Sequence, residues 1–247
     1  MTNSEYVKET IRGKQILKSE HNSKDDDGMK KQEILNWSYG KLETLNLFIP
    51  RLLGGSSTEE VSDDFKKELR ASLESQTDDE EQIQAVFDQV ANGVPMYWGD
   101  QPGTSGPAYQ GAIVVFLAIL GFFFAWKKYR YWILGASILT ILLAWGSNFL
   151  PLSDLFIDYV PLYNKFRAPS SILVVVELLF PLIAIIGLYR FYNDEKLTEE
   201  YKQKILLYVG GSVLGITLLI ILFAKSLFGF ESAAETGKIP DFIMTVI

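Results

Sequence analysis

The sequence predicts an all-α polytopic membrane protein with four transmembrane helices, preceded by an outer N-terminal region that contains a small helical hairpin. Three observations lead to this fold class. Four long apolar runs follow one another in the second half of the chain, the charge changes sharply between the two halves, and aromatic residues stand at the ends of the runs. A buried helix of a soluble protein could mimic one such run, but four in succession indicate a membrane protein.

The charge of the chain is unevenly distributed. Residues 1–108 carry 20 acidic and 12 basic residues, whereas residues 109–247 carry 10 acidic and 11 basic residues. A break of this kind usually marks a change of solvent along the chain.

The chain has no cysteine, and its only histidine is His21. Disulfide scaffolds, thiolate metal sites and histidine-based clusters or triads are therefore excluded. The sequence also lacks a Walker loop, a Rossmann glycine pattern, a nucleophile elbow and a zincin signature.

Three predicted segments precede the apolar runs. A polar and interfacial segment is followed by an acidic helical hairpin and then by a loop rich in proline and glycine; they cover residues 1–57, 58–93 and 94–108. Thr58 and the acidic residues after it predict the start of the first hairpin helix, and Gly93 predicts the end of the second. We interpret the hairpin as a solvated insertion.

The loop of residues 94–108 brings polar and aromatic side chains to the membrane face, directly before the first run. They are Tyr97, Trp98, Asp100 and Gln101. Rings beside a carboxylate and an amide suit a carbohydrate, whose apolar faces stack on aromatic rings while its hydroxyls bind polar groups. The alternative is an interfacial aromatic belt followed by a turn.

The transmembrane region is predicted over residues 109–225. Each run has about the length needed to cross a hydrocarbon core of roughly 30 Å, and the expected spans are residues 109–126, 131–149, 172–189 and 205–223. Within the fourth span, Gly211 and Gly215 form a pair of small residues that permits close approach of another helix. Residues 226–247 are expected to form an outer tail.

The distribution of cations predicts the orientation of these spans. The links after the first and third runs carry seven lysine and arginine residues, whereas the link between the second and third carries only Lys165 and Arg167. The positive-inside rule then puts the loop of residues 150–171 and both termini outside. Because residues 1–35 contain no apolar signal core that would export an outer tail, we expect the chain to be a piece of a longer protein.

The outer loop of residues 150–171 contains a predicted interfacial helix that Pro161 ends. Asp154 and Asp158 share one face of this helix. Such a pair could bind a divalent cation, but two exposed acids on a surface helix are more typical of an ordinary polar face.

Lys165 and Arg167 follow on a segment that is predicted to be non-helical, because Pro169 disfavours the helical conformation of the residue before it. Tyr163 lies beside them. Cations at the level of the lipid headgroups suit a phosphate or a diphosphate, whether of a lipid headgroup or of a lipid-linked sugar. The alternative is generic anchoring to lipid headgroups.

Glu177 is the one charged residue deep inside a predicted span. It lies about one and a half turns into the third run, near the outer face. A charge in this position normally faces a cavity or a partner of opposite charge. Two interpretations follow: an ion pair with Lys165 or Arg167 that fixes the outer loop, or a place in the wall of a substrate cavity.

Three stretches of the sequence resemble a known family. They read WSYGKLETLNLFIPRLLGG, YWGDQPGTSGPAYQGAIVVFLAILG and LLAWGSNFLPLSDLFIDYVPLYNKFRAPSSILVVVELLFPLIA. In this order they resemble the YfhO-like family of large bacterial membrane proteins, in the versions from Bacteroidetes-type bacteria, over roughly residues 35–55 and 95–190. The acidic hairpin between them resembles a variable insertion.

The resemblance implies a glycosyltransferase of the GT-C type. Such enzymes have many transmembrane helices, use a polyprenyl-phosphate sugar as donor, and transfer the sugar at the outer face of the cytoplasmic membrane. The presumed catalytic acid of the family lies in its first outer loop, so we expect this chain to be a middle portion without that loop. No catalytic residue is carried over, no metal ligand is assigned, and a divalent metal in the full-length protein is left open.

Two functional hypotheses follow. In the first, the chain is part of a membrane glycosyltransferase: Lys165 and Arg167, beside Tyr163, neutralise the phosphate, Glu177 holds their loop, and Tyr97, Trp98 and Asp100 meet the sugar. In the second, the chain is a non-catalytic protein of envelope assembly or scaffolding, and the hairpin binds a partner. The expected partners are the lipid bilayer, a polyprenyl-phosphate sugar and the remaining transmembrane helices of the full-length protein; nucleic acid is not expected.

Overall fold

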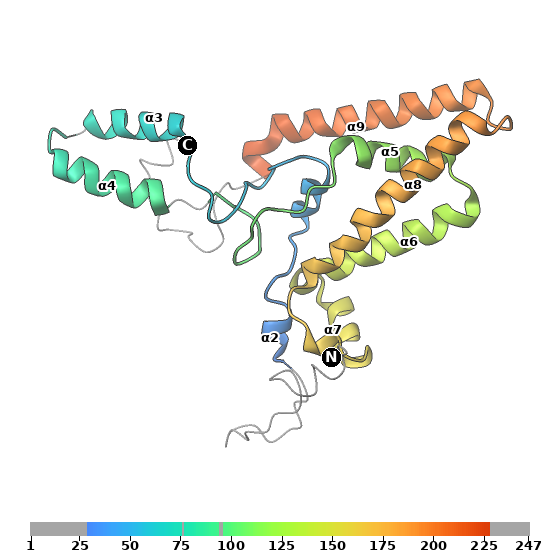
Figure 1. The fold of residues 1–247 in the computed structure, drawn as a ribbon, viewed down its shortest axis with the longest axis horizontal. Coiled ribbons are helices and arrows are strands. Elements are labelled where there is room, and N and C mark those ends of the chain that lie inside the picture. The colour runs from blue at the N-terminus through green and yellow to red at the C-terminus, as the bar shows by residue number, and fades with distance from the viewer. Residues whose placement is uncertain (1–28, 76, 94–95, 228–247) are drawn as a thin grey trace, which may run out of the picture.

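The computed structural model describes residues 29–75, 77–93 and 96–227, which form helices joined by turns and loops (Figure 1). Within these ranges the elements are helices, and the pairing of Gly54 with Tyr97 is a single β-bridge rather than part of a sheet. The predicted all-α class is therefore confirmed. The short elements are α2 (Lys31–Ile34), η1 (Leu42–Leu47), η2 (Gly146–Phe149), η3 (Tyr163–Lys165) and η4 (Pro169–Leu173).

The predicted hairpin consists of α3 (Asp63–Glu74) and α4 (Glu80–Gly93). Leu69, Leu73 and Ile83 form its small buried core, and the hairpin projects away from the other helices (Figure 1). The prediction that α3 starts near Thr58 is wrong. Glu59 is held in a turn by an ion pair with Arg51, so the helix begins after Ser62, whose hydroxyl accepts a hydrogen bond from the Phe65 N–H at 3.2 Å.

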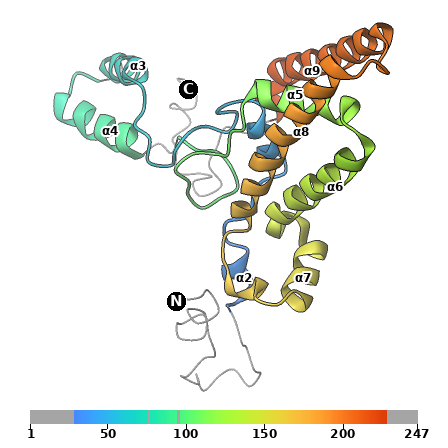
Figure 2. The ribbon, with the colours of Figure 1, turned by 45° about the vertical axis from the view of Figure 1, so that its right-hand side comes forward.

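The long helices are α5 (Ala112–Phe124), α6 (Lys127–Ala144), α8 (Val174–Asn193) and α9 (Glu199–Leu227) (Figure 2). Helices α5, α6 and α8 pack on one another, and α9 packs on α5. At what we call the loop end, the Tyr39 N–H donates to the carbonyl of Ala144 at 2.8 Å. At the opposite end, which we call the basic end, Arg190 donates to the carbonyl of Phe124 at 3.0 Å. Arg190 there satisfies a carbonyl that the end of α5 leaves without an intrahelical partner.

Among the residues that the structure describes, two helices are long and apolar enough to cross a membrane, Pro169–Asn193 and Glu199–Phe223. A third span qualifies if α6 and the helix after it count as one bent span. Four spans are therefore not confirmed. The predicted first span fails on length, because the 13 residues of α5 extend only about 20 Å. Its predicted first residues belong to the loop instead, because the Gln110 N–H donates to Leu47 and Gly111 has a φ of 99°.

The predicted second span is broken at its end. The chain bends by 113° between α6 and α7 (Leu150–Tyr159), which is the predicted short helix before Pro161. Gly146 is required at the bend: its φ is 47°, and a Cβ added there would lie 2.2 Å from the hydroxyl of Ser38. On α7, Asp154 forms an ion pair with Lys31 at 2.5 Å.

Helices α5 and α8 cross at two glycines. A Cβ added to Gly187 would lie 2.4 Å from the Cα of Gly121, and one added to Gly121 would lie 2.4 Å from the carbonyl oxygen of Ile183. Glycine thus lets the two backbones touch. At Gly211 and Gly215, by contrast, an added Cβ would meet nothing within 4 Å. The predicted close approach at that pair is not seen within the described part of the chain.

The outer faces of α8 and α9 are apolar and exposed. Leu178 on α8 is 70% exposed and Leu222 on α9 is 75% exposed, and many similar side chains surround them. A soluble monomer rarely exposes apolar surface on this scale. The helices are instead suited to contact the hydrocarbon of a lipid bilayer.

Candidate functional site

Four segments that are distant in sequence meet at the loop end of the helices. We call this meeting point the polar junction and define it as residues 37–46, 97–103, 144–148 and 167–170. Two backbone donors illustrate how closely the segments are tied: the Ser147 N–H donates to the Ser38 hydroxyl at 2.8 Å, and the Ser170 N–H donates to the Trp37 carbonyl at 3.2 Å. The junction is therefore a fixed part of the fold.

Glu43 lies at the centre of the polar junction and is completely buried. The first turn of η1 puts it there. Its Oε1 accepts hydrogen bonds from the Tyr97 hydroxyl at 2.5 Å and from the Gln101 side-chain amide at 3.0 Å, and its Oε2 accepts one from the Gly40 N–H at 2.8 Å. Both carboxylate oxygens thus have donors, which is the condition under which a buried carboxylate is tolerated.

Burial shifts the titration of both central residues. It raises the pKa of Glu43 above the ordinary value and outweighs the hydrogen bonds, which favour the charged form; the nearby carboxylate of Asp100 raises it further. Burial also raises the pKa of Tyr97, and its hydrogen bond to Glu43 adds to this effect. In the hydrogen bond between them the Tyr97 hydroxyl is the donor and a Glu43 carboxyl oxygen is the acceptor.

Asp100 is the exposed carboxylate of the polar junction. Its Oδ2 accepts a hydrogen bond from the side-chain amide of Asn148 at 3.0 Å, and the same amide donates to the Tyr39 carbonyl at 3.0 Å. Gly40 permits this position, because a Cβ there would lie 2.9 Å from the Asp100 Oδ2. One oxygen of Asp100 is thus held by the protein while the side chain faces outward.

Arg167 is an exposed cation of the polar junction, and Lys41 is another. Its guanidinium carbon lies 5.3 Å from the centre of the Trp37 ring, an arrangement that favours a cation–π interaction. The Trp37 indole donates to the Gly103 carbonyl at 3.1 Å, and the Ser170 hydroxyl donates to the Gln101 side-chain oxygen at 3.2 Å. The bond of Ser170 thus ties the segment that carries Arg167 to the loop that carries Asp100, and the bond of Trp37 ties its own segment to the same loop.

The other predicted residues of the outer loops lie below the surface or partly so. Lys165 is buried, and the half-buried Tyr163 packs edge-on against Phe156 with ring centres 5.6 Å apart. Burial raises the pKa of Tyr163. Trp98 is half-buried, and its backbone N–H donates to the Leu53 carbonyl at 2.9 Å. Lys165 is therefore buried, whereas Arg167, two residues later, is exposed.

Glu177 lies on the exposed side of α8, and its backbone carbonyl accepts a hydrogen bond from the Gln110 side chain at 3.0 Å. The ion pairs in the described part of the chain do not include Glu177. Pairing with Lys165 or Arg167, which was one interpretation of the sequence, is thus not observed in this structure.

The structure changes the expected role of Tyr97 and adds Glu43 to the junction. Tyr97, expected to meet a ligand, is only 3% exposed and holds Glu43 instead. Glu43 itself was not singled out, although a carboxylate within the apolar stretch of residues 42–49 carries the same signal that drew attention to Glu177. Among the residues that the structure describes, no group of three or more histidine, cysteine, aspartate or glutamate side chains is placed to hold a metal ion.

The chain was also compared with known proteins. No protein-family model, curated protein or solved structure matches it.

Proposed function

We propose that this chain is part of an integral membrane glycosyltransferase of the GT-C type. It would act at the outer face of the bacterial cytoplasmic membrane and move a sugar from a polyprenyl-phosphate donor to an acceptor of the cell envelope. The apolar helices support the membrane location, and the resemblance to the YfhO-like family supports the reaction class.

One observation carries the proposal: an exposed cation and an exposed carboxylate are mounted on the same polar junction. Arg167 stands over Trp37, and Asp100 is held by Asn148. In such a transfer an acceptor hydroxyl oxygen forms a bond to the anomeric carbon and loses its proton to a base, while the bond between the anomeric carbon and the phosphate oxygen breaks. Negative charge then grows on the departing lipid phosphate. A guanidinium binds such a group through charge-assisted hydrogen bonds.

The remaining candidate residues have supporting parts in this proposal. Asp100 accepts hydrogen bonds from sugar hydroxyls, and Trp98 offers its partly exposed ring to the sugar. Tyr97 and Glu43 keep the loop of Asp100 in place from below. Lys165, which is buried, and Tyr163, which is half-buried, would support the segment of Arg167 from within, and Glu177 on α8 is exposed.

The test is to replace Arg167 with alanine in the complete protein and to measure sugar transfer from polyprenyl-phosphate donors in isolated membranes. Loss of a charge-assisted hydrogen bond of about 1.5–3 kcal/mol is expected to lower the transfer rate roughly 10- to 100-fold. The amount of protein in the membrane should not change, because Arg167 is exposed.

Arg70→Ala is the matched control, since Arg70 is an exposed arginine on α3, outside the polar junction. Its transfer rate should equal that of the wild type. Full activity of the Arg167→Ala protein at normal abundance would rule out the proposed phosphate contact.

The second candidate function is a non-catalytic role in envelope assembly or scaffolding. The observation that favours it is the hairpin of α3 and α4, which has its own core and projects away from the other helices (Figure 1). If a partner binds there, charge reversals such as Glu80→Lys should impair envelope assembly in cells, whereas Arg167→Ala should have no effect. Arg167→Ala therefore distinguishes the two hypotheses: it should lower sugar transfer if the chain belongs to a glycosyltransferase and have no effect if the chain is a scaffold.

A further inference from the structure

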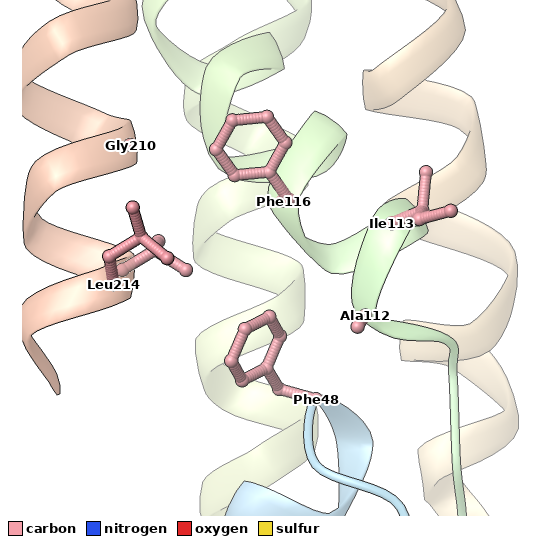
Figure 3. Close-up of a pocket in the computed structure, with 7 residues that line it drawn as sticks. Phe48, Ala112, Ile113, Phe116, Gly210 and Leu214 are labelled. Atoms are coloured by element: carbon pink, nitrogen blue, oxygen red, sulfur yellow. The ribbon is translucent and has the colours of Figure 1, made fainter. Parts of the chain in front are cut away.

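A hollow of about 380 Å³ separates the middle of α9 from the start of α5 (Figure 3). Phe116 and Leu214 lie on the two helices that flank it, and Phe48, which follows η1, lies near the start of α5. The residues that line it are Phe48, Ala112, Ile113, Phe116, Gly210, Val213 and Leu214.

The walls of this hollow expose no polar atom. A water molecule held there would lack the two to four hydrogen-bond partners that ordered buried waters have. The hollow opens to the outside between side chains that are themselves exposed and apolar: Ile113 is 74% and Leu214 is 66% exposed. Its lining is therefore continuous with the apolar surface that the helices present to a bilayer.

The hollow lies beside the place where α9 packs on α5. Val209 packs against Leu120 and Phe124, and two lining residues, Phe116 and Val213, pack against the same cluster. Farther along α9, Ile220 packs against Leu53. Gly210 contributes no side chain on the side that faces α5, and an added Cβ would meet nothing within 4 Å. The gap thus follows from the sequence of α9 at this position.

We propose that the hydrocarbon chain of a bilayer phospholipid occupies this hollow and connects α9 with α5. The hollow is too small for a helix, but its volume is in the range of small-molecule sites. An acyl chain has no hydrogen-bonding groups to satisfy and enters directly from the surrounding membrane. Burial of its methylenes against Phe48 and Phe116 stabilises both the lipid and the position of α9.

The test compares Gly210→Phe with Gly211→Phe in the full chain, reconstituted in nanodiscs with a phospholipid that carries a photoreactive group on its acyl chain. Both positions are open to a new side chain, but only Gly210 lines the hollow. If the ring introduced by Gly210→Phe displaces two to three methylenes, crosslinking to residues 112–116 and 213–214 should fall about 10- to 50-fold, at roughly 0.8 kcal/mol per methylene. Gly211→Phe should crosslink like the wild type.

Three results would overturn the proposal. The first is equal crosslinking of Gly210→Phe and wild type. The second result concerns the wild type alone. Leu178 and Leu222 are exposed elsewhere on the helices. If they are labelled as often as the lining residues, the label reports ordinary contact with the surrounding lipid. The third is displacement of the label by a polyprenyl phosphate but not by excess phospholipid, which would identify the occupant as an isoprenoid chain.

Discussion

Replacing Gly187 with alanine is expected to push α8 away from α5 and to destabilise the helical assembly by about 1–3 kcal/mol, the usual cost of overpacking. The added Cβ would lie 2.4 Å from the Cα of Gly121, and the atom it meets belongs to the backbone of another helix. Neither a rotamer change nor a small side-chain shift can relieve such a contact. The effect should appear as a lower midpoint of thermal unfolding for the purified protein in detergent.

Gly215→Ala provides the control for this experiment. It makes the same chemical change in an apolar helix, but the new methyl group would meet nothing within 4 Å. Because alanine is the better helix former by roughly 1 kcal/mol, this variant should be as stable as the wild type or slightly more stable. Equal midpoints for Gly187→Ala and Gly215→Ala would contradict the close crossing of α5 and α8.

Replacing Glu43 with alanine should have the largest effect within the polar junction. The change removes the acceptor of the Tyr97 hydroxyl, the Gln101 amide and the Gly40 N–H. Each buried donor left without a partner costs about 1–3 kcal/mol, so the loss of unfolding free energy is expected to be about 3 kcal/mol or more. Chemical unfolding followed by tryptophan fluorescence would measure it, since Trp37 and Trp145 belong to the junction.

Glu43→Gln separates the shape of this side chain from its charge. An amide oxygen still accepts from Tyr97, but the amide nitrogen cannot accept from the Gly40 N–H. We therefore expect a smaller destabilisation than for alanine. A glutamine variant as unstable as the alanine variant would mean that the hydrogen bond to Gly40, rather than the set of three, fixes the junction.

The pH dependence of stability provides an independent check on Glu43. Its pKa in the folded protein is raised above the ordinary 4.5, so the folded state binds the proton more tightly than the unfolded state. The resulting stabilisation is complete below pH 4.5 and is lost as the pH rises through the folded pKa. Glu43→Gln should lack this component when unfolding midpoints are compared across that interval.

The helices were well predicted where composition alone decides them. Long apolar runs make α8 and α9 recognisable without knowledge of their neighbours. The bounds of the helices depend on contacts with distant segments as well. The Gln110 N–H donates to Leu47 just before Gly111, where α5 is shortened, and Gly146 lies against Ser38 where the chain bends after α6. Sequence patterns report local preference, whereas these ends are set by tertiary contacts.

The candidate site was predicted in part. Asp100 and Arg167 were named because exposed charges beside a membrane are conspicuous in a sequence. Glu43 was not, because its donors Tyr97 and Gln101 lie 54 and 58 residues away, and only the fold brings them together. The glycine contacts were likewise not readable from spacing. Gly211 and Gly215 have the four-residue spacing typical of close helix packing, yet the backbones of α5 and α8 meet at Gly121 and Gly187, one on each helix.

The hydrogen bonds of the polar junction also have a consequence for the order of folding. The bonds from Trp145 to Thr44 and from Ser147 to Ser38 close loops of 101 and 109 residues, whereas each helix forms from contacts a few residues apart. Loop closure over such distances is entropically costly and comes after local structure. The junction should therefore form last, after α6 has been inserted. Its formation would distinguish the native chain from a state in which the helices have formed but the loop segments are not yet bound to one another.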